Sequence, residues 1–297
     1  MCGIVGLFLK DAQLAPHLGA LLSQMLVTLT DRGPDSAGIA LYGAETPGTA
    51  RLTVQSDSPD TAFATLADDL TATLGQPVTL ERRANHAVLT LPEPALDTAR
   101  AALATRPGLR IMSGGRRIEI FKDVGRPATV TRRFGIEAMA GTHGIGHSRM
   151  ATESAVTTMG AHPFSTGPDQ CLVHNGSLSN HNNVRRRLRH AGLGFETDND
   201  SEVAAAYLTH RMAQGDDLDA ALHHALEDLD GFYTFVVGTR DGFGVLRDPI
   251  ACKPAVMAET PEYVAFGSEY RAMANLPGIE QARIWEPEPA TVYFWKH

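Results

Sequence analysis

Two apolar runs separated by an Asp-Gly dipeptide limit the fold of this 297-residue chain more than any other feature of the sequence. The runs cover residues 232–238 and 243–247, and they flank Asp241-Gly242. Asp-Gly between two such runs is a strong signal for a tight β-hairpin, whose strands are antiparallel. The sequence therefore favours antiparallel sheets over the repeated strand–helix–strand units that build parallel sheets.

Weaker signals extend this pattern along the chain. A pair of strands is expected on either side of Gly114-Gly115, and helices are expected to open at Asp200 and Asp217, two residues suited to N-caps. Other strands are expected over residues 4–9, 36–42, 86–91, 171–174, 263–266 and 291–295, and helices over 14–29, 94–103, 200–213 and 217–229. Hairpins combined with paired helices predict an α+β layered sandwich.

The stretch over residues 44–140 differs from the rest in its many Thr, Asp, Pro and Arg residues. A structureless loop of about 95 residues is improbable inside a compact domain. The sequence therefore predicts an inserted α+β subdomain over 44–140, within one domain that covers 1–297.

Charge and cysteine usage exclude several classes of protein. The net charge of -8 opposes general binding to nucleic acids or anionic membranes, because both need a positive surface. The N-terminal apolar run lacks a basic leader, and no apolar stretch approaches the roughly 20 residues of a membrane helix. The three cysteines form no CxxC pair, which argues against a zinc ribbon or an iron–sulfur cluster: Cys2, Cys171 and Cys252. We expect a reduced, cytoplasmic protein.

Cys2 is the first candidate for chemistry. Removal of Met1 would give this residue both a thiol and a free α-amino group, whose pKa is roughly 7.7–8 in model compounds. Such an amine can accept the thiol proton, so that nucleophile and base sit on one residue. The alternative is a structural cysteine buried in the first strand.

Eight short motifs give Cys2 its context. They are Cys2–Gly6, Arg32–Gly38, Gly146–Thr152, Ala161–Phe164, Val173–Asn180, Asp198–Glu202, Arg247–Pro249 and Gly267–Glu269. In this order they resemble the class II glutamine amidotransferases, whose glutaminase domain is an N-terminal-nucleophile hydrolase. The resemblance implies a four-layer αββα sandwich of two antiparallel sheets.

The resemblance also implies a role for individual residues. Arg149 would bind the α-carboxylate of glutamine, and Asp200 its α-ammonium group. The side-chain amide of Asn175 and the backbone N–H of Gly176 would stabilise the oxyanion, while Thr152 would contact the substrate. Ordinary alternatives remain: a surface ion pair for Arg149, an N-cap for Asp200 and a plain turn for Asn175-Gly176.

Supporting roles are expected for further motif residues. Arg32 and Asp35 would brace the loop that carries Cys2, and His174 would hold the scaffold behind the site. We expect the same of His147 and His162, because no spacing in the sequence fits a metal site. Met150 departs from the aromatic residue that many relatives carry.

The reaction implied by the resemblance releases ammonia from L-glutamine and yields L-glutamate through a γ-glutamyl thioester. It needs no cofactor on this chain and allows FMN and an iron–sulfur cluster on partner subunits. No P-loop or GxGxxG fingerprint occurs, so the acceptor chemistry is expected on separate synthase subunits. The amino-acid sequences of the motifs resemble those of the amidotransferase subunit of N-methylglutamate synthase and of split glutamate-synthase-like systems.

Alternative functions stay open at this point. One is a free-standing glutaminase or γ-glutamyl transferase, and another is a non-catalytic scaffold subunit that retains Met1. The basic run Arg185–Arg189 is either a solvated helix face or a docking surface for an acidic partner. We also expect the insert to dock the partner.

Overall fold

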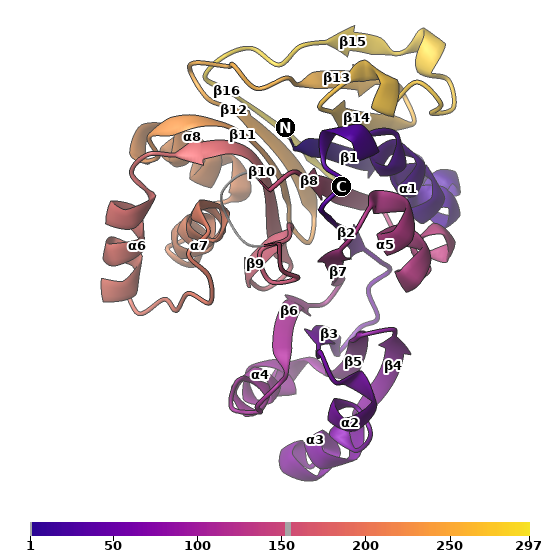
Figure 1. Ribbon diagram of the computed structural model, residues 1–297, viewed down its shortest axis with the longest axis vertical. Coiled ribbons are helices and arrows are strands. Elements are labelled where there is room, and N and C mark those ends of the chain that lie inside the picture. The colour runs from indigo at the N-terminus through magenta and orange to yellow at the C-terminus, as the bar shows by residue number, and fades with distance from the viewer. Residues whose placement is uncertain (1, 152–155) are drawn as a thin grey trace.

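Two antiparallel sheets lie face to face at the centre of the computed structural model, which describes residues 2–151 and 156–297 (Figure 1). The seven-stranded sheet has the order β15 (Arg283–Trp285), β13 (Val256–Glu259), β14 (Tyr263–Gly267), β1 (Gly3–Leu9), β8 (His143–Arg149), β2 (Ser36–Tyr42) and β7 (Ile118–Val124). The five-stranded sheet has the order β16 (Thr291–Lys296), β12 (Gly242–Arg247), β11 (Gly231–Gly238), β10 (Gln170–Leu178) and β9 (Phe164–Gly167). The expected hairpin is β11–β12, in which Gly238 pairs with Phe243.

Helices cover the outer face of each sheet and complete four layers (Figure 1). The seven-stranded sheet packs against α1 (Leu18–Thr28) and α5 (Pro127–Phe134). The five-stranded sheet packs against α7 (Asp200–Ala213) and α8 (Leu218–Asp228), and α6 (His181–His190) packs against α7. Buried apolar side chains fill the space between the sheets and both spaces beneath the helices. The α+β fold class is confirmed. Among the described residues, no helix has the length and apolar character needed to cross a bilayer.

A third, smaller sheet extends from one end of the sandwich, at the bottom of Figure 1. Its order is β4 (Thr79–Arg83), β5 (His86–Pro92), β3 (Thr49–Gln55) and β6 (Arg110–Gly115), and it carries α2 (Pro59–Ala62), α3 (Leu66–Leu74) and α4 (Leu96–Ala104). It has an apolar core of its own, to which Leu52, Leu70 and Leu89 contribute. The separate sheet spans residues 49–115, and a subdomain with bounds 44–140 stays a prediction.

The prediction of paired strands on either side of Gly114-Gly115 is wrong, because both glycines lie inside β6 and β6 does not pair with β7. β6 belongs to the small sheet and β7 to the seven-stranded sheet. Asp169 fixes the connection between β6 and β7, because its carboxylate accepts hydrogen bonds from the backbone N–H groups of Arg116 (2.7 Å), Arg117 (2.8 Å) and Ile118 (3.0 Å). These three bonds satisfy the amides that a hairpin partner would otherwise take up.

The two helix starts differ from each other. Asp217 caps α8 as expected, since its carboxylate accepts the N–H of Ala220. The prediction that Asp200 caps α7 is wrong. Asn199 is the N-cap and accepts the N–H of Ser201 at 2.9 Å, which leaves the Asp200 carboxylate inside the first turn and available for other contacts.

Candidate active site

Strand register brings the N-terminus and Arg149 to the same end of the seven-stranded sheet. Gly3 pairs with Ser148, and Ser36 pairs with Arg149. Cys2, immediately before β1, therefore lies beside the end of β8. Arg149 is only 7% exposed, which contradicts the alternative of a surface ion pair.

The carbonyl oxygen of Cys2 accepts hydrogen bonds from two of the predicted site residues. Nε of Arg32 donates at 3.1 Å and Nδ2 of Asn175 at 3.4 Å. Arg32 and Asn175 come from segments far apart in the sequence, and both converge on one backbone atom. The side-chain amide of Asn175 thus lies next to the residue that carries the candidate nucleophile, which is half-buried.

The motif at residues 267–269 anchors this N-terminal strand, a role that sequence reasoning did not assign to it. The N–H of Ile4 donates to Oγ of Ser268, and the N–H of Ser268 donates back to the carbonyl of Ile4, both at 2.9 Å. Glu269 forms an ion pair with Arg32, and this hydrogen bond lowers the pKa of the Glu269 carboxyl. The family motif was the only signal in the sequence for these contacts.

Asp35 fixes the chain on both sides of Met150. Its N–H donates to the carbonyl of Arg149 at 3.1 Å, and its Oδ2 accepts the N–H of Ala151 at 2.8 Å. The expected bracing role of Asp35 is therefore directed at the β8 end. Thr152, the other predicted substrate contact, lies outside the described residues.

Asn175-Gly176 is not a turn, because β10 continues through it to Leu178. Gly176 pairs with Tyr233 on β11, and the carbonyl of Tyr233 accepts from Asp248 on its other side at 3.1 Å. Gly176 and Tyr233 therefore form a non-hydrogen-bonded pair, and the N–H of Gly176 points away from β11. The other neighbour of β10 is β9, which pairs with it only as far as Leu172. The N–H of Gly176 therefore lies beyond the part of β10 that β9 covers.

Only glycine fits at position 176. Its φ of +145° is disfavoured for other residues, and an added Cβ would lie 2.0 Å from the carbonyl oxygen of Phe232. We expect Gly176→Ala to lower the free energy of unfolding by about 2–3 kcal/mol, measured by urea denaturation. Gly215 is the matched control, because it has a φ of +106° and open space around it. Gly215→Ala should cost about 1 kcal/mol, and equal costs for the two variants would contradict a clash at Gly176.

Asp200 reaches the site from the first turn of α7. Its Oδ2 accepts the N–H of Leu178 at 2.9 Å, and its Oδ1 lies 3.7 Å from Nδ1 of His174. The side chain keeps 22% of its surface exposed, which leaves room for a ligand. Leu178 follows Asn175 and Gly176 on β10, so one strand carries both predicted oxyanion donors and also orients Asp200.

Three buried histidines lie behind Asp200. His147 stacks on His162 with ring centroids 4.1 Å apart, and Nε2 of His147 donates to the carbonyl of His174 at 3.2 Å. Burial lowers the pKa of His147 to about 3 and also lowers the pKa values of His162 and His174, although Asp200 opposes the shift at His174. All three rings are therefore neutral near pH 7. Within the described residues, no group of three side chains could hold a metal ion.

The other two cysteines differ from Cys2 in their surroundings. Cys171 is fully buried between the sheets, where burial raises the pKa of its thiol to about 12 and Tyr42 contacts its Sγ at 3.3 Å. A buried thiol with a raised pKa is a poor nucleophile. Cys252 is exposed and lies in the segment between β12 and β13.

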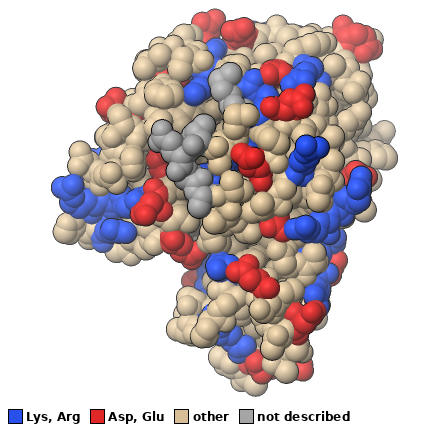
Figure 2. All heavy atoms as spheres, viewed as in Figure 1, with Lys and Arg blue, Asp and Glu red and all other residues tan. Residues whose placement is uncertain are grey.

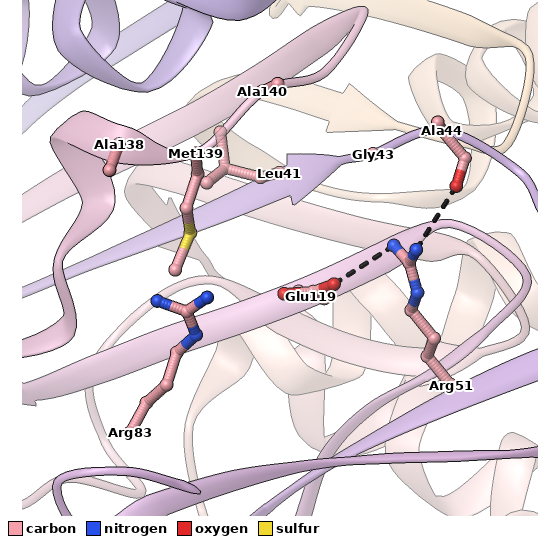
Figure 3. A pocket seen from close by; sticks show the side chains of 9 residues that line it. All are labelled: Leu41, Gly43, Ala44, Arg51, Arg83, Glu119, Ala138, Met139 and Ala140. Carbon is pink, nitrogen blue, oxygen red and sulfur yellow. Dashed lines mark hydrogen bonds and ion pairs between the residues drawn. The ribbon is translucent and has the colours of Figure 1, made fainter. Parts of the chain in front are cut away.

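A cavity of about 270 Å³, drawn in Figure 3, is lined by Leu41, Gly43 and Ala44 at the C-terminal end of β2, whereas Ser36 at the other end of β2 pairs with Arg149. At one side of this cavity, Arg51 pairs with Glu119 at 3.0 Å and donates to the carbonyl of Ala44. Burial raises the pKa of Glu119, and Arg51 opposes that shift. None of the predicted site residues lines this cavity, so we assign it to the junction with the small sheet.

Comparison with known proteins gives the fold and the site a family context. Residues 147–275 match the model of a glutamine amidotransferase domain. The chain is 66% identical over 298 residues to a glutamine amidotransferase-like protein, GlxB, of Rhizobium meliloti, and the match covers 100% of this chain and 99% of the relative. A shorter match, 42% identical over 102 residues, is to glutamine–fructose-6-phosphate aminotransferase of Xanthomonas campestris and covers 34% of this chain and 16% of that enzyme.

Solved structures agree on the fold. The glutamine phosphoribosylpyrophosphate amidotransferase of B. subtilis, complexed with ADP and GMP, superposes with a TM-score of 0.64 at 18% identity. A second structure, described as the allosteric regulatory enzyme of purine biosynthesis, gives 0.65 at 19% identity. Both matches cover 99% of this chain and 47% of the other, so the chain spans about half the length of these enzymes.

Proposed function

Because the chain belongs to the class II glutamine amidotransferases, we propose that it is a glutaminase subunit in which Cys2 is the nucleophile. The observation that carries the proposal is the hydrogen bond from Asn175 to the carbonyl of Cys2. It brings a preorganised amide donor to the residue whose thiol would attack the substrate.

The first step is activation of the thiol. With Met1 removed, the α-amino group of Cys2 takes the thiol proton, and the thiolate attacks the γ-carboxamide carbon of glutamine. The carbonyl π electrons move to oxygen and form an oxyanion. Asn175 Nδ2 and the outward N–H of Gly176 donate to this oxyanion, and loss of one such donor typically costs ~10²–10³ in rate.

Collapse of this intermediate breaks the C–N bond. The protonated α-amino group returns its proton to the leaving nitrogen, and ammonia departs. A γ-glutamyl thioester remains on Cys2. Water then attacks the thioester, glutamate leaves, and the thiol is restored.

The remaining site residues hold the two charged ends of glutamine. Arg149 is proposed to bind the α-carboxylate, because a guanidinium fork matches that group and the side chain is buried at the end of β8. Asp200 is proposed to bind the α-ammonium group, and Thr152 to contact the substrate. Support for Asp200 comes from its position beside the oxyanion donors on β10 and from its exposed carboxylate surface.

Replacement of Asp200 tests this clamp. We expect Asp200→Asn to raise the KM for glutamine by about 10- to 100-fold, since a hydrogen bond between charged groups contributes about 1.5–3 kcal/mol. Steady-state ammonia release measures the effect. Asp198→Asn is the matched control, because Asp198 is fully exposed and pairs only with Arg185 among the described residues. A KM equally changed in both variants would contradict the role of Asp200.

An intact-mass measurement tests the nucleophile. Protein from the native host is treated with a glutamine-analogue diazoketone, and any adduct is mapped by peptide sequencing. We expect loss of Met1 and a single adduct on Cys2. Retained Met1 with no adduct, even when partners are present, would instead support a scaffold subunit.

The acceptor chemistry is proposed to reside on separate synthase subunits, with N-methylglutamate synthase as the assignment favoured by the motifs. A basic surface on α6 supports a charged interface. Arg186, Arg187 and Arg189 are exposed there, whereas Arg185 is buried and pairs with Asp198. Figure 2 shows Lys and Arg gathered at the left edge, where Figure 1 places α6. Co-purification from the native host decides the question, since a monomer active alone would indicate a free-standing glutaminase or γ-glutamyl transferase.

A further inference from the structure

The hydroxyl group of Ser201 lies at the centre of the buried polar cluster behind Asp200. Its Oγ is 2.7 Å from Nε2 of His162 and 2.9 Å from Nδ1 of His174. It is also 3.5 Å from Oδ1 of Asp200, the acceptor toward which it can donate. Ser201 is 1% exposed, so solvent does not compete for these positions. Nothing in the family motifs assigns this hydroxyl a function.

The unused ring nitrogens determine the tautomers of the histidines. Nδ1 of His147, Nδ1 of His162 and Nε2 of His174 are buried without a hydrogen-bond partner in the described part of the chain. Neutral imidazole has one N–H donor and one bare nitrogen. A buried N–H without an acceptor is rare and costly, so each unused nitrogen is the bare one. His162 therefore carries its proton on Nε2 and His174 carries its proton on Nδ1.

Both of these N–H groups point at Ser201, which fixes the direction of its own proton. A serine hydroxyl accepts two hydrogen bonds and donates one. With its two acceptor positions taken by His162 and His174, its O–H must point elsewhere, and Oδ1 of Asp200 is the acceptor within reach. At 3.5 Å this last contact is long, as catalytic hydrogen bonds often are before substrate binds.

We propose that Ser201 is a positioning residue that aims Asp200 at the α-ammonium group of glutamine. The inference rests on the proposed function, in which Asp200 binds that group. The N–H of Leu178 donates to Oδ2 of Asp200 at 2.9 Å, and the Ser201 hydroxyl donates to Oδ1. Together the two contacts restrain rotation of the carboxylate about its Cβ–Cγ bond. The neutral histidines polarise the hydroxyl without placing a competing cation next to Asp200. Burial, which lowers the pKa of both His162 and His174, keeps them neutral.

Two substrates separate positioning from simple structural support. Glutamine carries the α-ammonium group, and its des-amino analogue, 4-carbamoylbutanoate, lacks it. We expect Ser201→Ala to raise the KM for glutamine by about 10-fold while kcat changes by less than about 3-fold. The kcat/KM for the analogue should stay within about 2-fold of the wild type, because that substrate offers Asp200 nothing to bind. The measurement uses the chain in complex with its native partners.

Two further variants complete the kinetic test. Ser201→Thr keeps the hydroxyl and should restore the KM for glutamine. Ser23→Ala is the matched control, since Ser23 is 2% exposed on α1 and its Oγ has no partner among the described residues. A Ser201→Ala variant that loses the same factor on glutamine and on the analogue would show a structural role only and overturn the proposal. A wild type that hydrolyses no glutamine would count against the proposed function instead.

Nitrogen NMR of the full chain labelled with ¹⁵N-histidine tests the proton arrangement without any activity. At pH 7 we expect neutral rings, with the proton of His174 on Nδ1 and that of His162 on Nε2. In Ser201→Ala both N–H groups lose their acceptor, and their signals should shift or exchange faster with water. The opposite tautomers, or a cationic ring at pH 7, would overturn the proposal whether or not the chain is a glutaminase.

Discussion

Replacing Cys2 by alanine is expected to lower the rate of ammonia release from glutamine by at least about 10⁴-fold, because the variant lacks the proposed nucleophile. The fold should be retained. Cys2 contributes its carbonyl group, not its side chain, to the hydrogen bonds with Arg32 and Asn175. The measurement is glutamate and ammonia production with the partner subunits present, together with a thermal unfolding curve.

Two other variants sharpen this result. Cys252→Ala removes the exposed thiol and should keep full activity, which excludes a general effect of thiol loss. Cys2→Ser keeps a hydroxyl in the same place, but its oxygen is a far weaker nucleophile than a thiolate at neutral pH. We expect Cys2→Ser to be much slower than the wild type. Substantial activity in Cys2→Ala would show that the proposed nucleophile is wrong.

Acidification from pH 7 to pH 5 is expected to destabilise the fold strongly. Burial lowers the pKa values of His86, His143 and His147 from 6.5 to about 3. Below pH 6.5 the unfolded chain binds protons that these folded residues do not, so their stabilisation is full above 6.5 and is lost as the pH falls toward 3. Linkage gives a loss of about 2 kcal/mol in the free energy of unfolding for each residue at pH 5, or about 6 kcal/mol for the three together. That is comparable to the whole stability of many domains.

Urea denaturation at several pH values measures this effect. His86→Leu should reduce the slope of unfolding free energy against pH by about one proton between pH 6 and pH 4. His190→Gln is the matched control, because His190 is exposed at the end of α6 and should leave the slope unchanged. A free energy of unfolding that stays constant from pH 7 to pH 5 would contradict neutral, buried histidines.

The sequence predicted what local chemistry determines. The Asp-Gly hairpin, the α+β class and the N-cap at Asp217 depend on neighbouring residues, and the structure confirms all three. The motif order also predicted a common site, and the bonds from Arg32 and Asn175 to Cys2 place these residues together. The roles assigned to them stay predictions until they are measured.

The failures have long-range causes. Asn-Gly usually forms a turn, but here Gly176 pairs with Tyr233 of β11 and β10 stays extended. β6, which contains Gly114-Gly115, joins the small sheet, and β7 joins the seven-stranded sheet. They can separate because Asp169 accepts the N–H groups of Arg116 and Arg117 between them. Ser201 lies 39 residues from His162, so no local pattern could have shown their contact.

The pairing of Tyr42 with Ile118 has a consequence for how this chain could be rebuilt. β2 and β7 are the two arms of a single hairpin, and the whole small sheet occupies the place of its turn. A two-residue connection such as Asn-Gly fits between paired strand ends of this kind. The small sheet is therefore an insertion in this hairpin, and its excision would uncover Phe121 and Phe134, on which its His86 ring packs. An excision that keeps both strands of the hairpin runs from Gly43 to Arg117.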